Sequence, residues 1–193
     1  MNILIITANP KPTNHTQIIA NTYKEIVESD KHTVRVVDLY AEENKLPSYK
    51  LSREVDPIVE KMKADVLWAE EIVFVHPVWW GNVPSVLKNW QDTLIAPGFA
   101  FKYIEGKPRG LLKGRTAKVF ATAGSVAPYY WLPLVHEFTP LYIQWKYMTL
   151  GFSGIEMIDF RVVDKMNVNN SQPPEGRFEA FIEKVKKSAR TLH

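Results

Sequence analysis

Apolar and polar positions along the chain follow two patterns, one typical of buried strands and one typical of helices. Residues 2–7 and 72–75 are apolar at almost every step, as in parallel strands that are covered on both faces. Between such runs, apolar residues recur at the spacing of an amphipathic helix. The predicted strands are 2–7, 33–39, 71–78, 117–122 and 155–163. The predicted helices are 18–27, about 53 to 68, near Pro84 to 94, one within 128–147, and 178–192.

Strands separated by helices in this order predict an α/β fold. We expect a doubly wound, five-stranded parallel sheet in a three-layer α/β/α arrangement. Strands 33–39 and 155–163 alternate in polarity, which favours positions near the edges of the sheet. Residues 41–53 and 97–114 are predicted as loops. Because no repeat, low-complexity tract or linker interrupts the pattern, residues 1–193 are predicted to form a single domain.

Composition narrows the class of protein. A hydrophobic fraction of 46% with 23% charged residues excludes a disordered chain. The absence of cysteine excludes a disulfide scaffold, a thiolate metal site and a cysteine nucleophile. The five histidines lack metal-ligand spacing, so no metal is expected. A net charge of +3 is too small to indicate nucleic acid. The longest apolar runs are too short for a signal peptide or membrane span, which predicts a cytoplasmic protein without membrane insertion.

The candidate ligand site is expected at one edge of the sheet. Ligands of open α/β sheets bind beyond the carboxyl ends of the strands, where the strand order reverses. Residues 9–16, 77–82 and 122–125 leave predicted strands at that edge. These three segments together make the candidate site.

The first segment enters a helix N-terminus, where backbone N–H groups and the helix dipole favour an anion. Thr13, Asn14 and Thr16 can add side-chain donors, although simple helix capping by Asn14 or Thr16 would explain the same residues. Neither a Walker loop nor a Gly-x-Gly-x-x-Gly fingerprint occurs in the chain. A phosphate held by hydroxyl groups rather than by glycines suggests a mononucleotide.

The second and third segments carry aromatic rings and a glycine. Either Trp79 or Trp80 taken alone is more often a core residue, but two adjacent tryptophans cannot both face inward, so one is predicted to face the crevice and a flat heteroaromatic ligand. Gly124 permits close approach of the backbone to a ligand, or belongs to an ordinary strand–helix turn. His136, farther along, could be a proton donor, but its position alone favours a surface residue of a helix.

The chain resembles the flavodoxin-like NAD(P)H:quinone oxidoreductases, which include the ancillary oxidoreductases of potassium-efflux systems. The resemblance rests on a Pro-x-aromatic-Trp turn and a Pro-x-x-Leu-Lys helix within 77–92, and on the Gly-Phe-Ala-Phe loop at 98–101. It extends over about residues 1–165. One departure is Ala123-Gly124, where the family usually has two glycines.

The resemblance implies a flavodoxin-like fold that binds a flavin, with the phosphate at 13–16 and the ring against the backbone of the other two segments. The implied cofactor-binding residues are Asn9, Thr13, Asn14, His15, Thr16, Pro77, Val78, Trp79, Trp80, Gly81, Asn82, Thr122, Ala123, Gly124 and Ser125. The implied catalytic proton donors are Tyr129 or Tyr130 together with His136. The chain lacks a long C-terminal extension, which favours FMN over FAD.

The resemblance also implies an activity: two-electron, ping-pong hydride transfer from NAD(P)H to a quinone or similar acceptor, in a homodimer with sites at the subunit interface. Two alternatives stay open. One is a flavin-binding regulatory subunit of a potassium-efflux transporter. The other is an electron-carrier flavodoxin, which is disfavoured because such carriers are acidic and this chain has a pI near 8.9. The sequence does not distinguish NADH from NADPH or identify the acceptor.

Overall fold

The computed structural model describes residues 1–11, 13–47, 56–124, 138–166 and 175–191. Its centre is a five-stranded parallel sheet with the strand order β2-β1-β3-β6-β7. The strands of this sheet are β1 (Asn2–Thr7), β2 (Thr33–Asp38), β3 (Glu71–Val78), β6 (Thr116–Ala123) and β7 (Glu156–Val163). The predicted fold class is confirmed, and the two alternating strands lie at the two edges, as predicted.

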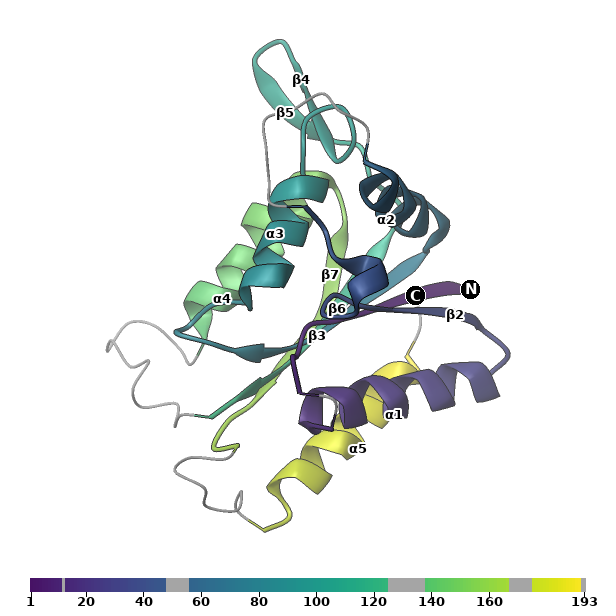
Figure 1. Cartoon of the computed structure of the whole chain (residues 1–193), viewed down its shortest axis with the longest axis vertical. Coiled ribbons are helices and arrows are strands. Elements are labelled where there is room, and N and C mark those ends of the chain that lie inside the picture. The colour runs from purple at the N-terminus through teal and green to yellow at the C-terminus, as the bar shows by residue number, and fades with distance from the viewer. Residues whose placement is uncertain (12, 48–55, 125–137, 167–174, 192–193) are drawn as a thin grey trace.

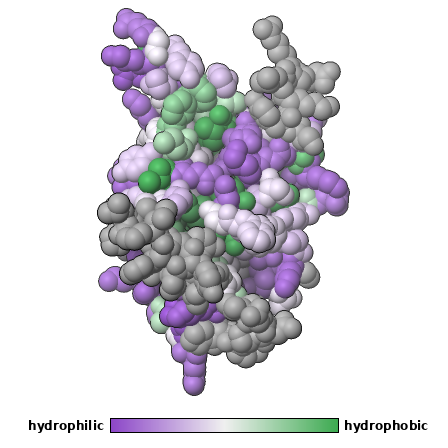
Figure 2. Space-filling model, turned by 90° about the vertical axis from the view of Figure 1, so that its left-hand side faces the viewer, coloured by the Kyte–Doolittle hydropathy of each residue, from purple (hydrophilic) through white to green (hydrophobic). Residues whose placement is uncertain are grey.

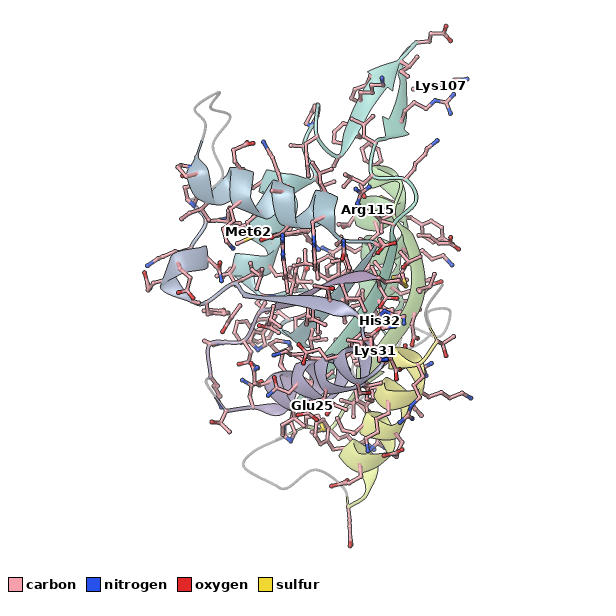
Figure 3. All side chains as sticks on the ribbon, turned by 90° about the vertical axis from the view of Figure 1, so that its right-hand side faces the viewer. Glu25, Lys31, His32, Met62, Lys107 and Arg115 are labelled. Carbon is pink, nitrogen blue, oxygen red and sulfur yellow. The ribbon has the colours of Figure 1, made fainter. Side chains whose placement is uncertain are left out.

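Helices cover both faces of the sheet (Figure 1). One face carries α1 (His15–Ser29) and α5 (Arg177–Ala189), which pack against each other. The other face carries α2 (Pro57–Trp68), α3 (Ser85–Leu94) and α4 (Thr139–Ile143). Met62 points from α2 towards the sheet (Figure 3) and is buried there. Two hydrophobic clusters, one on each side of the sheet, result from this arrangement.

The predicted loop 97–114 is wrong in part, because it contains a hairpin of β4 (Phe101–Ile104) and β5 (Lys107–Gly110). Glu105 and Gly106 connect the strands, and both have positive φ angles of 50° and 74°. Two such residues match the right-handed twist of a hairpin. The hairpin extends away from the main sheet with Lys107 near its end (Figures 1 and 3).

Three other boundaries differ from prediction. Helix α2 begins at Pro57 rather than near residue 53, because the Asp56 side chain accepts hydrogen bonds from the Ile58 and Val59 N–H groups, at 2.8 and 3.2 Å. The predicted loop 41–53 includes a short 3₁₀ helix, η1 (Glu42–Asn44). The helix expected within 128–147 is α4, and it continues into a π-helical segment, η3 (Gln144–Gly151).

A buried ionic network that the sequence did not indicate joins α1 to the amino-terminal halves of β3 and β6. Lys118 on β6 lies 3.1 Å from the Glu71 carboxylate on β3, and both side chains are almost wholly buried. The Lys118 Nζ also donates to the Tyr23 hydroxyl of α1 at 2.8 Å. The Tyr23 hydroxyl donates to Glu71 at 2.5 Å. The network therefore joins three of the elements that flank the candidate site, one residue from each.

Among the described residues, no helix has the length and apolar character that a membrane span requires.

Candidate functional site

The three predicted segments meet at one edge of the sheet. The Ala8 N–H donates to the Val75 carbonyl at 3.1 Å, so the loop after β1 starts beside the end of β3. On the other side of β3, Val78 is paired with Ala123 at the end of β6. The strand order reverses between β1 and β3, which is where ligands of this class of sheet bind.

The first segment forms a capped helix N-terminus. The Asn14 Oδ1 accepts a hydrogen bond from the Gln17 N–H at 2.9 Å, so the capping role considered for Asn14 is confirmed. Thr16 is buried, and its hydroxyl accepts a hydrogen bond from the Asn9 side-chain amide at 3.0 Å. The first turn of α1 contains no acidic residue. The N–H groups of His15 and Thr16 thus lie at a helix terminus that suits an anion.

His15 occupies the first position of α1. Its ring packs edge-on against Phe178 of α5, with the ring centroids 4.5 Å apart. Partial burial lowers the pKa of His15 from its usual value of 6.5. A neutral imidazole is therefore expected at this helix terminus near pH 7.

The second segment is a tight turn that exposes both tryptophans. Trp79 and Asn82 exchange backbone hydrogen bonds of 2.9 and 3.0 Å, while Trp80 and Gly81 between them have φ angles of 51° and 75°. Trp79 is 41% exposed and Trp80 is 102% exposed. The prediction that one ring leaves the core is too conservative, because the turn directs both outward. An exposed pair of indoles beside loop backbone is suited to a flat aromatic ligand.

The third segment ends at a crowded glycine. The Met166 N–H donates to the Ala123 carbonyl at 2.9 Å, and a Cβ on Gly124 would lie 3.3 Å from the Met166 carbonyl oxygen. The neighbouring backbone therefore favours glycine here even without a ligand. Ser125, Tyr129, Tyr130 and His136 lie outside the described residues. The catalytic and cofactor-binding roles assigned from the resemblance all stay predictions.

His76, for which the sequence indicated no role, lies near the end of β3 and is fully buried. Its Nδ1 lies 2.9 Å from the Pro77 carbonyl oxygen, and its Nε2 has no hydrogen-bond partner among the described residues. Burial lowers the pKa of His76 to about 4. The signal that could have found it is a histidine inside the otherwise apolar run of a central strand.

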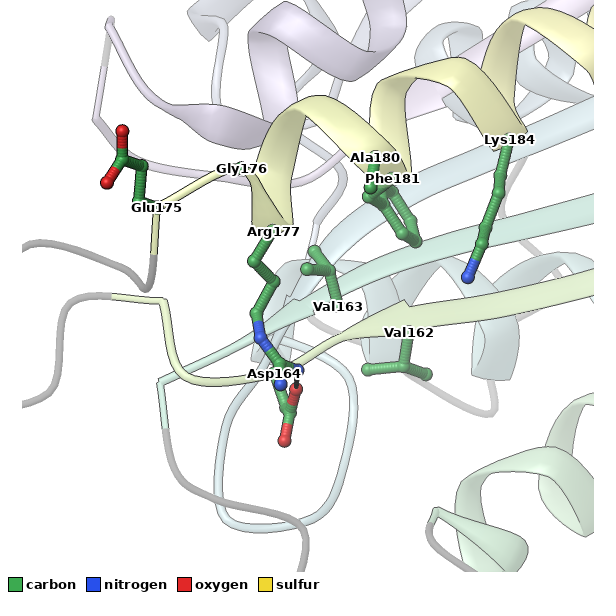
Figure 4. Close-up of a pocket in the computed structure, with 9 residues that line it drawn as sticks. All are labelled: Val162, Val163, Asp164, Glu175, Gly176, Arg177, Ala180, Phe181 and Lys184. Atoms are coloured by element: carbon green, nitrogen blue, oxygen red, sulfur yellow. Dashed lines mark hydrogen bonds and ion pairs between the residues drawn. The ribbon is translucent and has the colours of Figure 1, made fainter.

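The described residues also line two cavities away from the three segments, between β7 and α5. The larger, of about 520 Å³, lies at the carboxyl end of β7, where Arg177 pairs with Asp164 (Figure 4). The second, of about 310 Å³, lies towards the amino-terminal half of β7 and is lined in part by Lys118 and Lys187. None of the described residues predicted to bind a ligand lines either cavity.

The strand order β2-β1-β3-β6-β7, with helices on both faces, is that of the flavodoxin-like class of doubly wound α/β proteins. The chain belongs to the protein family described as having a flavodoxin-like fold, which it matches over residues 1–189.

Comparison with known proteins gives relatives with similar sequences and structures. The chain is 32% identical over 117 residues to an FMN-dependent NADH:quinone oxidoreductase from Azotobacter vinelandii, a match over 61% of this chain and 55% of the relative. It is 33% identical over 132 residues to an uncharacterized NAD(P)H oxidoreductase from Haemophilus influenzae, over 65% of each. The matches thus span less than two thirds of these relatives. The crystal structure of Smu.1420 from Streptococcus mutans superposes with a TM-score of 0.82 at 23% identity, over 100% of both chains.

Proposed function

We propose that the protein is an FMN-dependent NAD(P)H:quinone oxidoreductase. The observation that carries the proposal is the meeting, at the switch point of the sheet, of a capped helix N-terminus without an acidic side chain and an exposed tryptophan pair. The Azotobacter vinelandii relative, named as an FMN-dependent NADH:quinone oxidoreductase, and the Haemophilus influenzae relative, named as an NAD(P)H oxidoreductase, support the same activity.

The residues fit a flavin mononucleotide. Its phosphate would be held by the N–H groups of His15 and Thr16 and by the hydroxyls of Thr13 and Thr16, at a helix end without an acidic side chain. Its ring would lie against the turn that carries Trp79 and Trp80 and against the Gly124 backbone. When bound, FMN supplies hydride transfer from a nicotinamide to an acceptor. The overall reaction converts NAD(P)H, one proton and a quinone into NAD(P)⁺ and a hydroquinone.

The chain's own residues have separate tasks. The capped helix orients the cofactor, and the indoles exclude water from one side of the crevice. Tyr129 or Tyr130, with His136, would provide the proton for the quinone oxygen. Because the proposed reaction consumes NAD(P)H, it supports a cytoplasmic location for the protein. The match to the family over residues 1–189 supports one functional domain over the chain.

We further propose a homodimer. Ile143, Tyr147 and Met148 expose apolar or aromatic surface on α4 and η3. Figure 2 shows this side of the molecule, on which hydrophobic side chains gather towards the end that carries the β4–β5 hairpin. Exposed apolar surface of this kind marks interfaces between proteins.

The test begins with the purified protein and its visible absorption spectrum after incubation with FMN. We expect a flavin spectrum that bleaches on addition of NADH or NADPH and recovers on addition of a quinone. Heat release should return FMN rather than FAD. A protein that takes up neither flavin, or a flavin-loaded protein that neither nucleotide reduces, contradicts the proposal.

A further inference from the structure

His76 lies in a buried cluster of aromatic rings. Its ring lies 5.7 Å from that of Trp145, which in turn lies 4.5 Å from the ring of Phe74. All three side chains are completely buried. The presence of two ring nitrogens in these surroundings therefore calls for a reason other than packing.

The hydrogen bond to Pro77 fixes the tautomer of this histidine. Because a carbonyl oxygen can only accept, the proton must be on Nδ1, which then donates to the Pro77 oxygen at 2.9 Å. The Nε2 atom is left as an acceptor without a partner among the described residues. A buried acceptor without a partner is unfavourable. His76 thus provides one directed hydrogen bond while leaving a second polar atom unsatisfied.

The bond replaces one that the sheet cannot make. The ladder between β1 and β3 ends with the Ala8 N–H donating to the Val75 carbonyl. Parallel ladders repeat every two residues, so the next donors would be the nitrogens of Pro77 and Pro10. Proline has no N–H group, and the ladder stops where the crevice opens. The Pro77 carbonyl loses its ladder donor in this way, and the His76 imidazole takes that place.

We propose that His76 is a positioning residue of the flavin site, which fixes the Pro77 carbonyl and with it the plane of the Pro77–Val78 peptide. The chain turns from this peptide directly into Trp79 and Trp80. A fixed peptide at the base of the turn presents the ring-binding backbone in one conformation before the ligand arrives, which lowers the cost of binding. This inference rests on the proposed function, because it assigns a role within the same site.

The test compares His76→Phe with His76→Asn in the full-length protein. Phenylalanine keeps the ring and its contact with Trp145 but removes both nitrogens, whereas the asparagine amide can donate from about the position of Nδ1. The readouts are the FMN dissociation constant, followed by flavin fluorescence, the midpoint potential of bound FMN, and the melting temperature at pH 7. We expect His76→Phe to melt no lower than the wild type yet to bind FMN about tenfold more weakly, as when an outer orienting group is lost. His76→Asn should recover most of the affinity.

Phe74→Leu is the matched control, because it changes the same aromatic cluster without touching a hydrogen bond. It should lower the melting temperature and leave the FMN affinity within about twofold, since only packing is lost. A His76→Phe protein with wild-type affinity and potential overturns the positioning role and leaves the proposed function standing. A wild-type protein that takes up no FMN overturns both. Nitrogen-15 NMR of the flavin-free protein gives an independent readout: the proton must be on Nδ1, and a proton on Nε2 overturns the inference.

Discussion

At the residue scale, the helix cap and the anion site are two uses of the same segment. Asn14 has an extended backbone, and its side chain accepts a hydrogen bond from the Gln17 N–H, which caps the helix where it begins. Because that side chain satisfies Gln17, the N–H groups of His15 and Thr16 are the ones left at the terminus for a ligand. The alternatives that the sequence left open for Asn14 are therefore compatible.

Replacement of Asn14 by alanine should destabilise the protein by about 1 kcal/mol, because α1 loses its side-chain cap. FMN affinity should fall as well, since the first turn becomes less ordered. Urea unfolding and flavin titration measure the two effects. Asn14→Ser, which restores a capping oxygen, is the control, and a serine variant as weak as alanine would contradict the role of the cap.

His76 predicts a specific acid dependence of stability. Its pKa is about 4 in the folded protein and near 6.5 when unfolded, so between these values the unfolded chain binds more protons. The stabilising effect of keeping His76 neutral is complete above pH 6.5 and is lost as the pH falls towards 4. The loss amounts to roughly 3 kcal/mol for a difference of this size. Chemical unfolding at several pH values should show a flatter profile for His76→Phe, and parallel profiles would contradict the assignment.

Many residues of the site could be predicted from the sequence, but the orientation of their side chains could not. The segment 77–82 was identified because two tryptophans follow a strand. Their exposure depends on the positive φ angles of Trp80 and Gly81, and tryptophan at such an angle is not expected from its propensity. His76 was missed because a histidine has no motif of its own when its partner is the next backbone carbonyl.

At the element scale, the hydrophobic pattern predicted the main sheet, whereas it did not predict the hairpin. β4 and β5 are short and mostly exposed, so they carry little apolar periodicity, and Pro108 argues against a strand. The turn at Glu105 and Gly106 was the available signal. The π-helical geometry of η3 likewise could not be predicted. A π-helix is a wider form of an otherwise helical segment and has no simple sequence pattern of its own.

The buried network ties α1, β3 and β6 together, and its loss should be costly. Lys118→Met leaves the Glu71 carboxylate buried without its cation, which should destabilise the protein by about 3–5 kcal/mol. The double variant Lys118→Met with Glu71→Gln should recover part of that loss, because the unpaired charge is gone. Lys88→Met is the control, since it removes an exposed pair with Asp92 and should change stability by less than about 1 kcal/mol. Denaturant unfolding decides, and equal effects for Lys118 and Lys88 would contradict the network.

At the scale of the whole molecule, strand order concentrates separate segments into one site. β1, β3 and β6 are neighbours in the sheet although they are far apart in sequence, and their carboxyl ends meet at one edge. The strand–helix alternation was enough to predict this convergence. The assembly of two chains could not be predicted in this way. A helix face that is buried in the core and a helix face that contacts a partner chain show the same apolar pattern in the sequence.

The proposed homodimer can be tested with two matched charge substitutions. Met148 of η3 is 67% exposed and Leu67 of α2 is 54% exposed, so glutamate at either position remains solvated in the monomer. If the face of α4 and η3 forms the interface, Met148→Glu buries a charge there and should convert the dimer to a 22.2 kDa monomer. Leu67→Glu should leave the dimer intact. Sedimentation equilibrium distinguishes the two masses. If both variants remain dimeric, the interface lies elsewhere. If the wild type is itself a monomer, each chain must complete its site without a partner.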